Sequence, residues 1–147
     1  MFKRILVPVD GSETSLQALQ TAGRLAAEHG GQLRVVHVMD RTAYLTGYDP
    51  SGGAAGALYE ALRSSGRQVL ADAEAAARQA GVPVDSAMLD ELGTRLGDAV
   101  AKAAQDWNAD LLVVGTHGRS GPSRLLLGSG AEQIIRFAPV PVLVVRG

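Results

Sequence analysis

The 147-residue sequence contains no cysteine, which excludes disulfide frameworks, zinc–thiolate sites and cysteine nucleophiles. It also has almost no net charge, with 14 Lys and Arg residues against 15 Asp and Glu, so nothing favours nucleic-acid binding, which needs a clustered basic surface. No apolar run approaches the roughly 18 residues of a membrane-spanning helix. The apolar run at 5–9 is also shorter than the roughly 7–15 residues that a signal peptide needs. We therefore expect a cytoplasmic, soluble chain.

Glycine, by contrast, is abundant: 18 of 147 residues, or about 12%, against an average near 7%. A charged content of 20% and an apolar content of 46% exclude general disorder. The length suits one domain with one core, so we expect a single domain over residues 1–147. The positions of the glycines then carry most of the functional information.

Hydrophobic periodicity predicts strands that alternate with helices. Strands are predicted at 5–9, 33–39, 82–88, 110–114 and 140–145, and helices at 12–28, 58–80, 94–107 and 129–137. The apolar stripe of the first helix is predicted to consist of Leu16, Leu19, Gly23 and either Ala26 or Ala27. Residues 40–57, rich in turn formers, are predicted to form a long loop. This alternation predicts an α/β fold with an open parallel five-stranded sheet and helices on both faces.

Two loops of the predicted sheet carry residues suited to ligand binding. In such sheets ligands bind beyond the carboxyl ends of the strands, where the strand order reverses. Val-Asp-Gly-Ser-Glu-Thr-Ser follows the first strand at 9–15, and Gly-Thr-His-Gly-Arg-Ser-Gly follows the fourth at 115–121. The second loop closes at Gly-Ser-Gly, 128–130, where Ser129 begins the last helix and the helix dipole favours phosphate. Its glycines let backbone N–H groups approach an anion, and Arg119 and Arg124 add positive charge.

Each loop also has an interpretation that needs no ligand. Ser129 and Glu132 match a capping box, and glycines between a strand and a helix often serve only a turn. Asp10 could meet a ribose or a metal-bound phosphate, but Asp is also a good helix N-cap. Spacing alone leaves both interpretations open at the second loop and favours the cap at the first.

The pattern Gly115-x-x-Gly118-x9-Gly128-Ser129 resembles the nucleotide-binding motif of the universal stress protein family, in its ATP-binding branch. Ile-Leu-Val-Pro-Val-Asp-Gly-Ser at 5–12, Val-His-Val at 36–38 and Ala-Pro-Val-Pro-Val-Leu-Val-Val at 138–145 resemble other segments of that family. The resemblance therefore covers essentially the whole chain. It departs at Gly130, where a larger apolar residue is common, and at Phe137, where His is common.

The resemblance implies a strand order of 3-2-1-4-5, which places the first and fourth strands side by side. It also implies reversible binding of ATP, with AMP or another adenine nucleotide as alternatives, and Mg²⁺ or Mn²⁺ held only through the phosphates. Asp10 would meet the ribose, Val38 the adenine, and the glycine-rich loop the ribose and phosphates. The nucleotide-binding residues are then Pro8, Val9, Asp10, Val38, Gly115, Gly118, Arg119, Gly128, Ser129 and Gly130.

Three functions stay open: a nucleotide-dependent sensor or interaction module in the stress response, a weak ATPase or adenylyl-transferring enzyme, and a nucleotide-free dimerisation module. No catalytic residue and no metal cluster is predicted, since His117 has no nearby acidic partner or nucleophile in the sequence. No residue is committed to orienting a nucleophile for phosphoryl transfer, so the enzyme hypothesis is the weaker one. Intact Gly118, Gly128 and Ser129 favour the sensor over the dimerisation module.

The last predicted strand raises a separate expectation about assembly. Its residues are apolar on both faces over 140–145, yet the implied strand order leaves it at an edge of the sheet. An exposed apolar edge promotes aggregation unless something covers it. Pairing of this strand with its copy in a two-fold dimer would cover it, and the resemblance also implies homodimers. We therefore expect a homodimer through residues 140–145.

Overall fold

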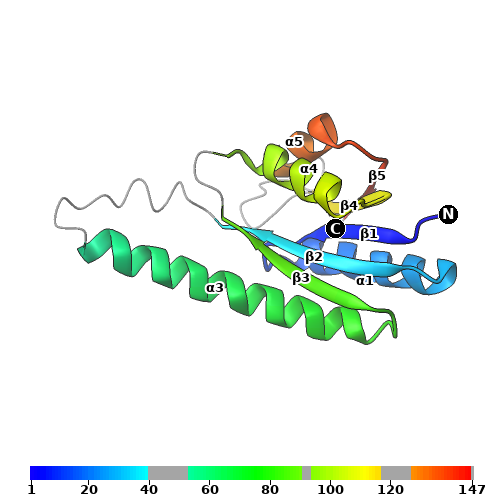
Figure 1. The fold of residues 1–147 in the computed structure, drawn as a ribbon, viewed down its shortest axis with the longest axis horizontal. Helices are drawn as coiled ribbons and strands as arrows, with labels where there is room; N and C mark the ends of the chain where they lie inside the picture. Colours follow the sequence, from blue (N-terminus) through cyan, green and yellow to red (C-terminus); the bar gives the residue numbers. More distant parts are fainter. Residues whose placement is uncertain (40–52, 91–93, 117–126, 147) are drawn as a thin grey trace.

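The computed structural model describes residues 1–39, 53–90, 94–116 and 127–146, except for the side chains of 53–55. Along the chain lie β1 (Arg4–Pro8), α1 (Glu13–His29), β2 (Gln32–Val38), α3 (Gly53–Arg78), β3 (Val84–Leu89), α4 (Leu96–Asp106), β4 (Leu111–Gly115), α5 (Ser129–Phe137) and β5 (Val142–Val145) (Figure 1). Within these ranges no helix combines the length and the apolar character needed to cross a membrane.

The five strands form one parallel sheet in the order β3-β2-β1-β4-β5, which confirms the predicted fold. β1 and β4 are therefore neighbours, with Ile5 opposite Leu111 and Leu6 opposite Leu112. Strand order reverses between these two strands, because the chain crosses first to β2 and later to β4. The carboxyl ends of β1 and β4 thus flank the point where such sheets bind ligands.

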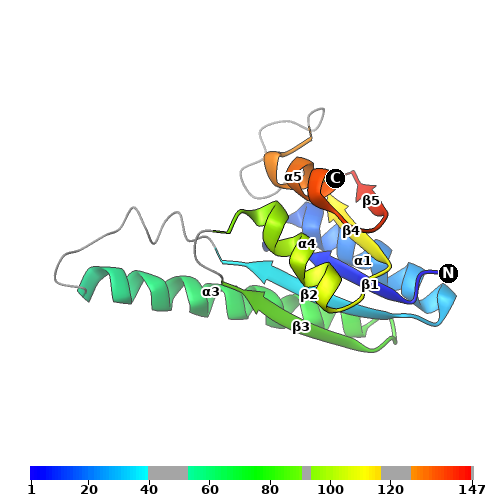
Figure 2. The same cartoon turned by 45° about the horizontal axis from the view of Figure 1, so that its top comes forward.

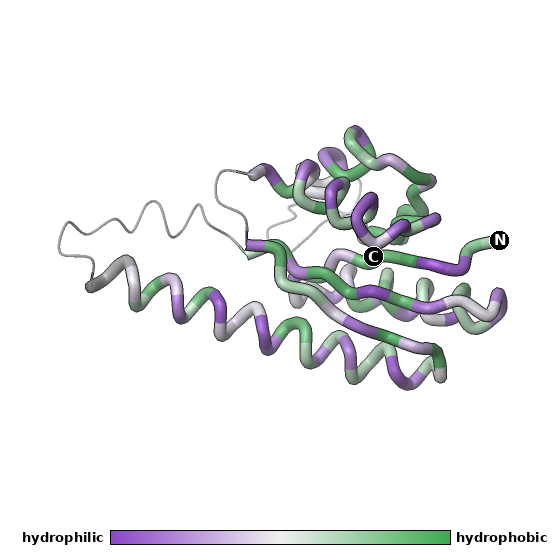
Figure 3. The backbone as a smooth tube through the Cα atoms, viewed as in Figure 1, coloured by the Kyte–Doolittle hydropathy of each residue, from purple (hydrophilic) through white to green (hydrophobic). Residues whose placement is uncertain are grey.

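Helices cover both faces of the sheet (Figure 2). Ile5 and Val7 pack on the α1 and α3 side, whereas Leu6 packs on the α4 and α5 side, and all three are fully buried. The central strand is therefore apolar throughout, as its continuous apolar run predicts. Figure 3 shows α3, by contrast, with apolar and polar residues alternating along its length, as expected for a helix with one face on the core.

Most elements begin and end within two residues of their predicted bounds, but α3 begins at Gly53 rather than at residue 58. The predicted loop is therefore wrong over 53–57, where alanines favour helix strongly enough to outweigh two glycines; residues 40–52 lie outside the described ranges. The first turns of α3 extend past the carboxyl ends of β2 and β3 (Figure 1). There Tyr59 and Arg63 donate hydrogen bonds to the carboxylate of Asp90, at 3.1 and 3.3 Å.

The predicted apolar stripe of α1 is wrong at Leu16, which is 40% exposed. The residues that α1 buries are mostly small: Thr14, Ser15, Ala18, Leu19, Ala22, Gly23 and Ala26. Small side chains let the helix lie close to its neighbours, and a Cβ atom on Gly23 would lie only 3.0 Å from the Cβ of Ala80. This close packing rotates the buried face away from Leu16.

Candidate functional site

The carboxyl end of β1 is held firmly between its neighbours. The N–H of Val9 donates to the carbonyl of Val36 at 2.8 Å, which continues the pairing with β2 beyond Pro8. Nδ1 of His37 lies 2.9 Å from the carbonyl oxygen of Val9, and the Val9 side chain is buried. Val9 therefore offers a fixed backbone position rather than a side chain facing solvent.

The loop from β1 to α1 is held by its own polar groups. Asp10 Oδ1 accepts a hydrogen bond from the N–H of Ser12 at 2.9 Å, and Gly11 adopts a left-handed conformation with φ of 84°. Ser12, not Asp10, is the N-cap: its Oγ accepts from the N–H of Ser15 at 3.2 Å. The interpretation of Asp10 as the cap is wrong, because the helix begins three residues later, at Glu13. The carboxylate of Asp10 instead orders the turn.

The end of β4 lies directly against the first turn of α1. A Cβ atom on Gly115 would lie 2.9 Å from the carbonyl oxygen of Thr14, which is closer than a real side chain tolerates. Glycine is therefore required at 115 by the close approach of another backbone rather than by an unusual φ. Through this contact the end of β4, from which the second loop leaves, lies against the start of α1.

The long loop after β4 is closed at its base by backbone hydrogen bonds. The N–H of Gly128 donates to the carbonyl of Thr116 at 2.6 Å, and the N–H of Thr116 donates to Val145 at 3.0 Å. Thr116 is buried, so this junction is part of the folded core. The start of α5 is therefore placed at the carboxyl end of β4, although residues 117–126 lie outside the described ranges.

The start of α5 differs from its predicted capping box. The N-cap is Gly128, which has no side chain to cap the helix, and Ser129 is the first helical residue. Glu132 pairs with Arg136 one turn later, at 3.4 Å, instead of reaching back to the N-cap. The capping box is wrong because the helix begins at Ser129, one residue earlier than that pattern needs. Gly130 packs against Leu96: a Cβ atom on Gly130 would lie only 2.7 Å from Cδ2 of Leu96.

The structure brings most of the predicted binding residues to one edge of the sheet. Pro8 and Asp10 are half-buried at the end of β1, and Val38 is half-buried at the end of β2 on the α4 and α5 side. Gly115 lies at the end of β4, and 128–130 form the start of α5. Gly118 and Arg119, together with Arg124 and His117, lie outside the described residues.

Sequence reasoning missed three residues that support this edge: Thr14, His37 and Thr116. Thr14 Oγ1 lies 3.2 Å from Ser12 Oγ, and Thr14 also supplies the backbone that touches Gly115. Thr116 directly follows the glycine that ends β4. It is buried, and its carbonyl accepts the hydrogen bond that holds Gly128. Among the described residues, no three His, Cys, Asp or Glu side chains lie close enough together to hold a metal ion.

Comparison with known proteins gives relatives that match nearly the whole chain. A universal stress protein of Thermus aquaticus is 38% identical over 149 residues, which covers 99% of this chain and 100% of the relative. A universal stress protein of Methanocaldococcus jannaschii is 34% identical over 146 residues, covering 99% of this chain and 83% of the relative.

Solved structures agree with these relatives. A universal stress protein family member from Burkholderia pseudomallei superposes with a TM-score of 0.78 at 32% identity, covering 99% of this chain and 97% of its own. A universal stress protein solved in complex with cAMP has a TM-score of 0.67 at 27% identity and covers 99% of this chain and 97% of its own. The profile described as the universal stress protein family matches residues 1–146. The chain therefore belongs to the universal stress protein family.

Proposed function

We propose that this universal stress protein reversibly binds an adenine nucleotide, ATP foremost, and acts as a sensor or interaction module in the stress response. The observation that carries the proposal is the hydrogen bond from Gly128 to Thr116, which fixes an uncapped helix start beside the end of β4. In this proposal, residues 1–147 form one nucleotide-binding domain.

The phosphates belong at the start of α5. The first N–H groups of a helix have no partner within it, and the helix dipole favours negative charge there. Gly128 is the N-cap and has no side chain, and Ser129, the first helical residue, is exposed. Three charge-assisted hydrogen bonds of about 1.5–3 kcal/mol each are enough for micromolar affinity, which corresponds to about −8 kcal/mol.

The ribose and the adenine belong at the ends of β1 and β2. The Asp10 carboxylate is oriented by the N–H of Ser12, so it is ready to accept a hydrogen bond from a ribose hydroxyl. Pro8 and Val38 are half-buried apolar residues on the same face of neighbouring strands, next to the backbone of Val9. Together they suit an apolar ring.

The remaining assignments rest on the sequence motif and on a relative. Gly118 and Arg119, with Gly115, complete the proposed nucleotide site; Mg²⁺ or Mn²⁺ would enter only as a complex with the phosphates. The 27%-identical universal stress protein solved with cAMP supports an adenine nucleotide as the ligand class.

Calorimetric titration of ATP, AMP and cAMP, with and without Mg²⁺, tests this proposal, together with an assay for released phosphate. We expect micromolar binding of at least one nucleotide without release of phosphate. Turnover would identify an enzyme instead, and no heat from any of the three would contradict nucleotide binding.

Gly118→Val extends the test to the proposed phosphate loop, because a branched side chain there blocks backbone approach to an anion. We expect nucleotide affinity to fall at least about tenfold, or about 1.4 kcal/mol. Gly56→Val is the matched control, since it places the same side chain in open space on α3. Unchanged affinity in Gly118→Val would remove the phosphate role from that loop.

We also propose that the protein is a homodimer through residues 140–145. β5 is an edge strand, and its Leu143 is 38% exposed while Val142 and Val144 are only half-buried. Pairing with a second copy would bury these side chains and satisfy the outer backbone groups of the strand. Solution scattering should give the mass of two chains at micromolar concentration, and Leu143→Lys should shift it toward one chain. A wild-type monomer would contradict the proposal.

A further inference from the structure

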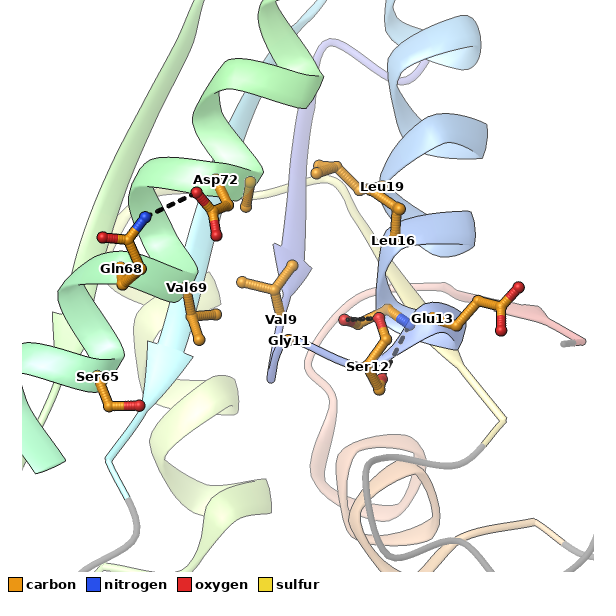
Figure 4. A pocket seen from close by; sticks show the side chains of 12 residues that line it. Val9, Gly11, Ser12, Glu13, Leu16, Leu19, Ser65, Gln68, Val69 and Asp72 are labelled. Atoms are coloured by element: carbon orange, nitrogen blue, oxygen red, sulfur yellow. Dashed lines mark hydrogen bonds between the residues drawn. The ribbon is translucent and has the colours of Figure 1, made fainter.

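A pocket with a volume of about 570 Å³ lies between α1 and α3, beside the carboxyl end of β1 (Figure 4). Pockets of roughly 300–1,000 Å³ are the size that small molecules occupy. The residues that line it are Val9, Gly11, Ser12, Glu13, Ser15, Leu16, Leu19, Ser65, Gln68, Val69, Asp72 and Ala73. Of the residues proposed to bind nucleotide, only Val9 lies among them.

The packing of small residues explains why the two helices leave this space. Gly23 of α1 lies close to Ala80, just beyond the end of α3, where an added Cβ would lie 3.0 Å from the facing methyl group. At the other end, Gly11 lies close to Val69, where an added Cβ would be 3.3 Å from the valine Cγ2. The pocket lies at the end marked by Gly11 and Val69, which are both among its lining residues.

The α1 wall of the pocket is apolar and partly open to solvent. Figure 4 shows Leu16 and Leu19 on α1, facing Val69 on α3 across Val9. Leu16 is 40% exposed, because the small residues of α1 and not this leucine face the core. A leucine exposed inside a pocket offers apolar surface that a ligand can cover.

The ionisable residues that line the pocket are all acidic: Glu13 and Asp72. Asp72 lies on α3 and accepts a hydrogen bond from Gln68 Nε2 at 2.8 Å, which holds its carboxylate in place (Figure 4). The Glu13 side chain points away from Val9, so Asp72 is the carboxylate that faces the space (Figure 4). Such a lining repels phosphates and carboxylates and attracts an ammonium group.

We propose that this pocket binds a small molecule with one ammonium group and an apolar body. The ammonium group pairs with Asp72, while the apolar body covers Leu16, Leu19 and Val69. The inference does not depend on nucleotide binding, because the pocket shares only Val9 with the residues proposed to bind nucleotide.

The test uses three phenyl-bearing probes that differ in charge: 2-phenylethylammonium, neutral 2-phenylethanol and anionic 3-phenylpropionate. Each is titrated into the ¹⁵N-labelled full chain without nucleotide and followed by amide chemical shifts. We expect saturable shifts at Leu16, Ser65 and Val69 with the ammonium probe, weaker binding of the alcohol and none of the anion. Absence of saturable shifts at these residues, or equal binding of all three probes, would overturn the proposal.

Two variants separate the ammonium contact from general effects. Asp72→Asn should weaken the ammonium probe about tenfold, since a charge-assisted hydrogen bond is lost. Glu60→Gln removes the same charge from an exposed position of the same helix outside the pocket and should leave affinity unchanged. Equal affinity in Asp72→Asn and the wild type would overturn the proposal.

Ser65→Phe fills the pocket from an exposed position on α3, so the fold is not at risk. It should abolish the probe-induced shifts at Leu16, while amide shifts elsewhere show that the chain is folded. Retained probe binding would place the ligand elsewhere and overturn the proposal. AMP titrated into the same sample reports on residues 128–130, so failure of the nucleotide proposal is seen separately.

Discussion

The start of α1 and the start of α5 both lie at the carboxyl edge of the sheet, yet they are built differently. At α1, the Oγ of Ser12 accepts from the N–H of Ser15, and Asp10 accepts from the N–H of Ser12. At α5, the N-cap is Gly128, which has no side chain, and Glu132 pairs forward with Arg136. The first helix start is capped by the side chain of Ser12, whereas the N-cap of the second has no side chain with which to do so.

This difference indicates which helix start is better suited to binding an anion. A helix N-terminus attracts phosphate only where its N–H groups still need an acceptor. Ser12 supplies that acceptor within α1, and the same loop adds the negative charges of Asp10 and Glu13. Two helix starts that look alike in the sequence are therefore assigned different roles in the proposed complex: α1 supports the site, and α5 would receive the phosphates.

The largest expected effect comes from the contact between the end of β4 and the first turn of α1. Gly115→Ala places a Cβ 2.9 Å from the backbone oxygen of Thr14, so we expect a loss of about 1–3 kcal/mol in the free energy of unfolding. Gly56→Ala, the same substitution in open space on α3, should instead gain about 0.5–1 kcal/mol. Urea denaturation measures both, and equal effects would show that the contact at Gly115 is unimportant.

Ser129→Asp tests the proposed phosphate position directly. The new carboxylate at an exposed helix start should stabilise the fold by about 0.3–1 kcal/mol through the helix dipole, yet repel a phosphate. We expect nucleotide affinity to fall about tenfold, or about 1.4 kcal/mol, in a calorimetric titration. Ser64→Asp, which adds the same charge to an exposed position on α3, should leave affinity unchanged. If Ser129→Asp binds as tightly as the wild type, the phosphates lie elsewhere.

The substitutions Ser12→Ala and Ser129→Ala compare the two helix starts by their effect on the free energy of unfolding. Ser12→Ala removes the N-cap of α1, so the free energy of unfolding should fall by about 1 kcal/mol. Ser129 is not the N-cap of α5, so Ser129→Ala should change the free energy of unfolding by less than about 0.5 kcal/mol. Chemical denaturation compares the two, and an equal loss in both would mean that Ser129 also acts as a cap.

The sequence was sufficient to predict the fold and, through the family resemblance, the sheet order that places β1 beside β4. Strands such as 5–9 are apolar on both faces, which requires helices on both sides, and the family resemblance supplied the order. Both predicted helix caps were wrong, because Asp10 and Ser129 each lie one or two residues from the true N-cap. Cap positions depend on where the backbone turns, and several neighbouring residues can serve as caps equally well.

Contacts between distant segments were also beyond prediction. The approach of Gly115 to Thr14 and the bond from Gly128 to Thr116 join segments that periodicity treats separately. Leu16 was assigned to the core because leucine is apolar, although the small residues of α1 pack more closely against its neighbours. Periodicity identifies one face of a helix, but tertiary packing decides the rotation of that face by a few tens of degrees.

The smallest expected effect comes from an ion pair between β2 and β3, away from both helix starts. It concerns how the free energy of unfolding depends on pH. Arg34 donates two hydrogen bonds to Asp85 across β2 and β3, at 2.7 and 2.9 Å, and this pairing holds the pKa of Asp85 below its ordinary value. The stabilisation is therefore complete above about pH 5 and is lost as the pH falls through the ordinary and then the folded pKa. Because the Asp85 side chain is 53% exposed, solvent screening limits it to about 0.5 kcal/mol or less. Wild type and Asp85→Asn should thus differ slightly in urea denaturation at pH 7 and converge as the pH falls below the folded pKa of Asp85. A difference that persists in acid would mean that Asp85 acts through packing and not through its charge.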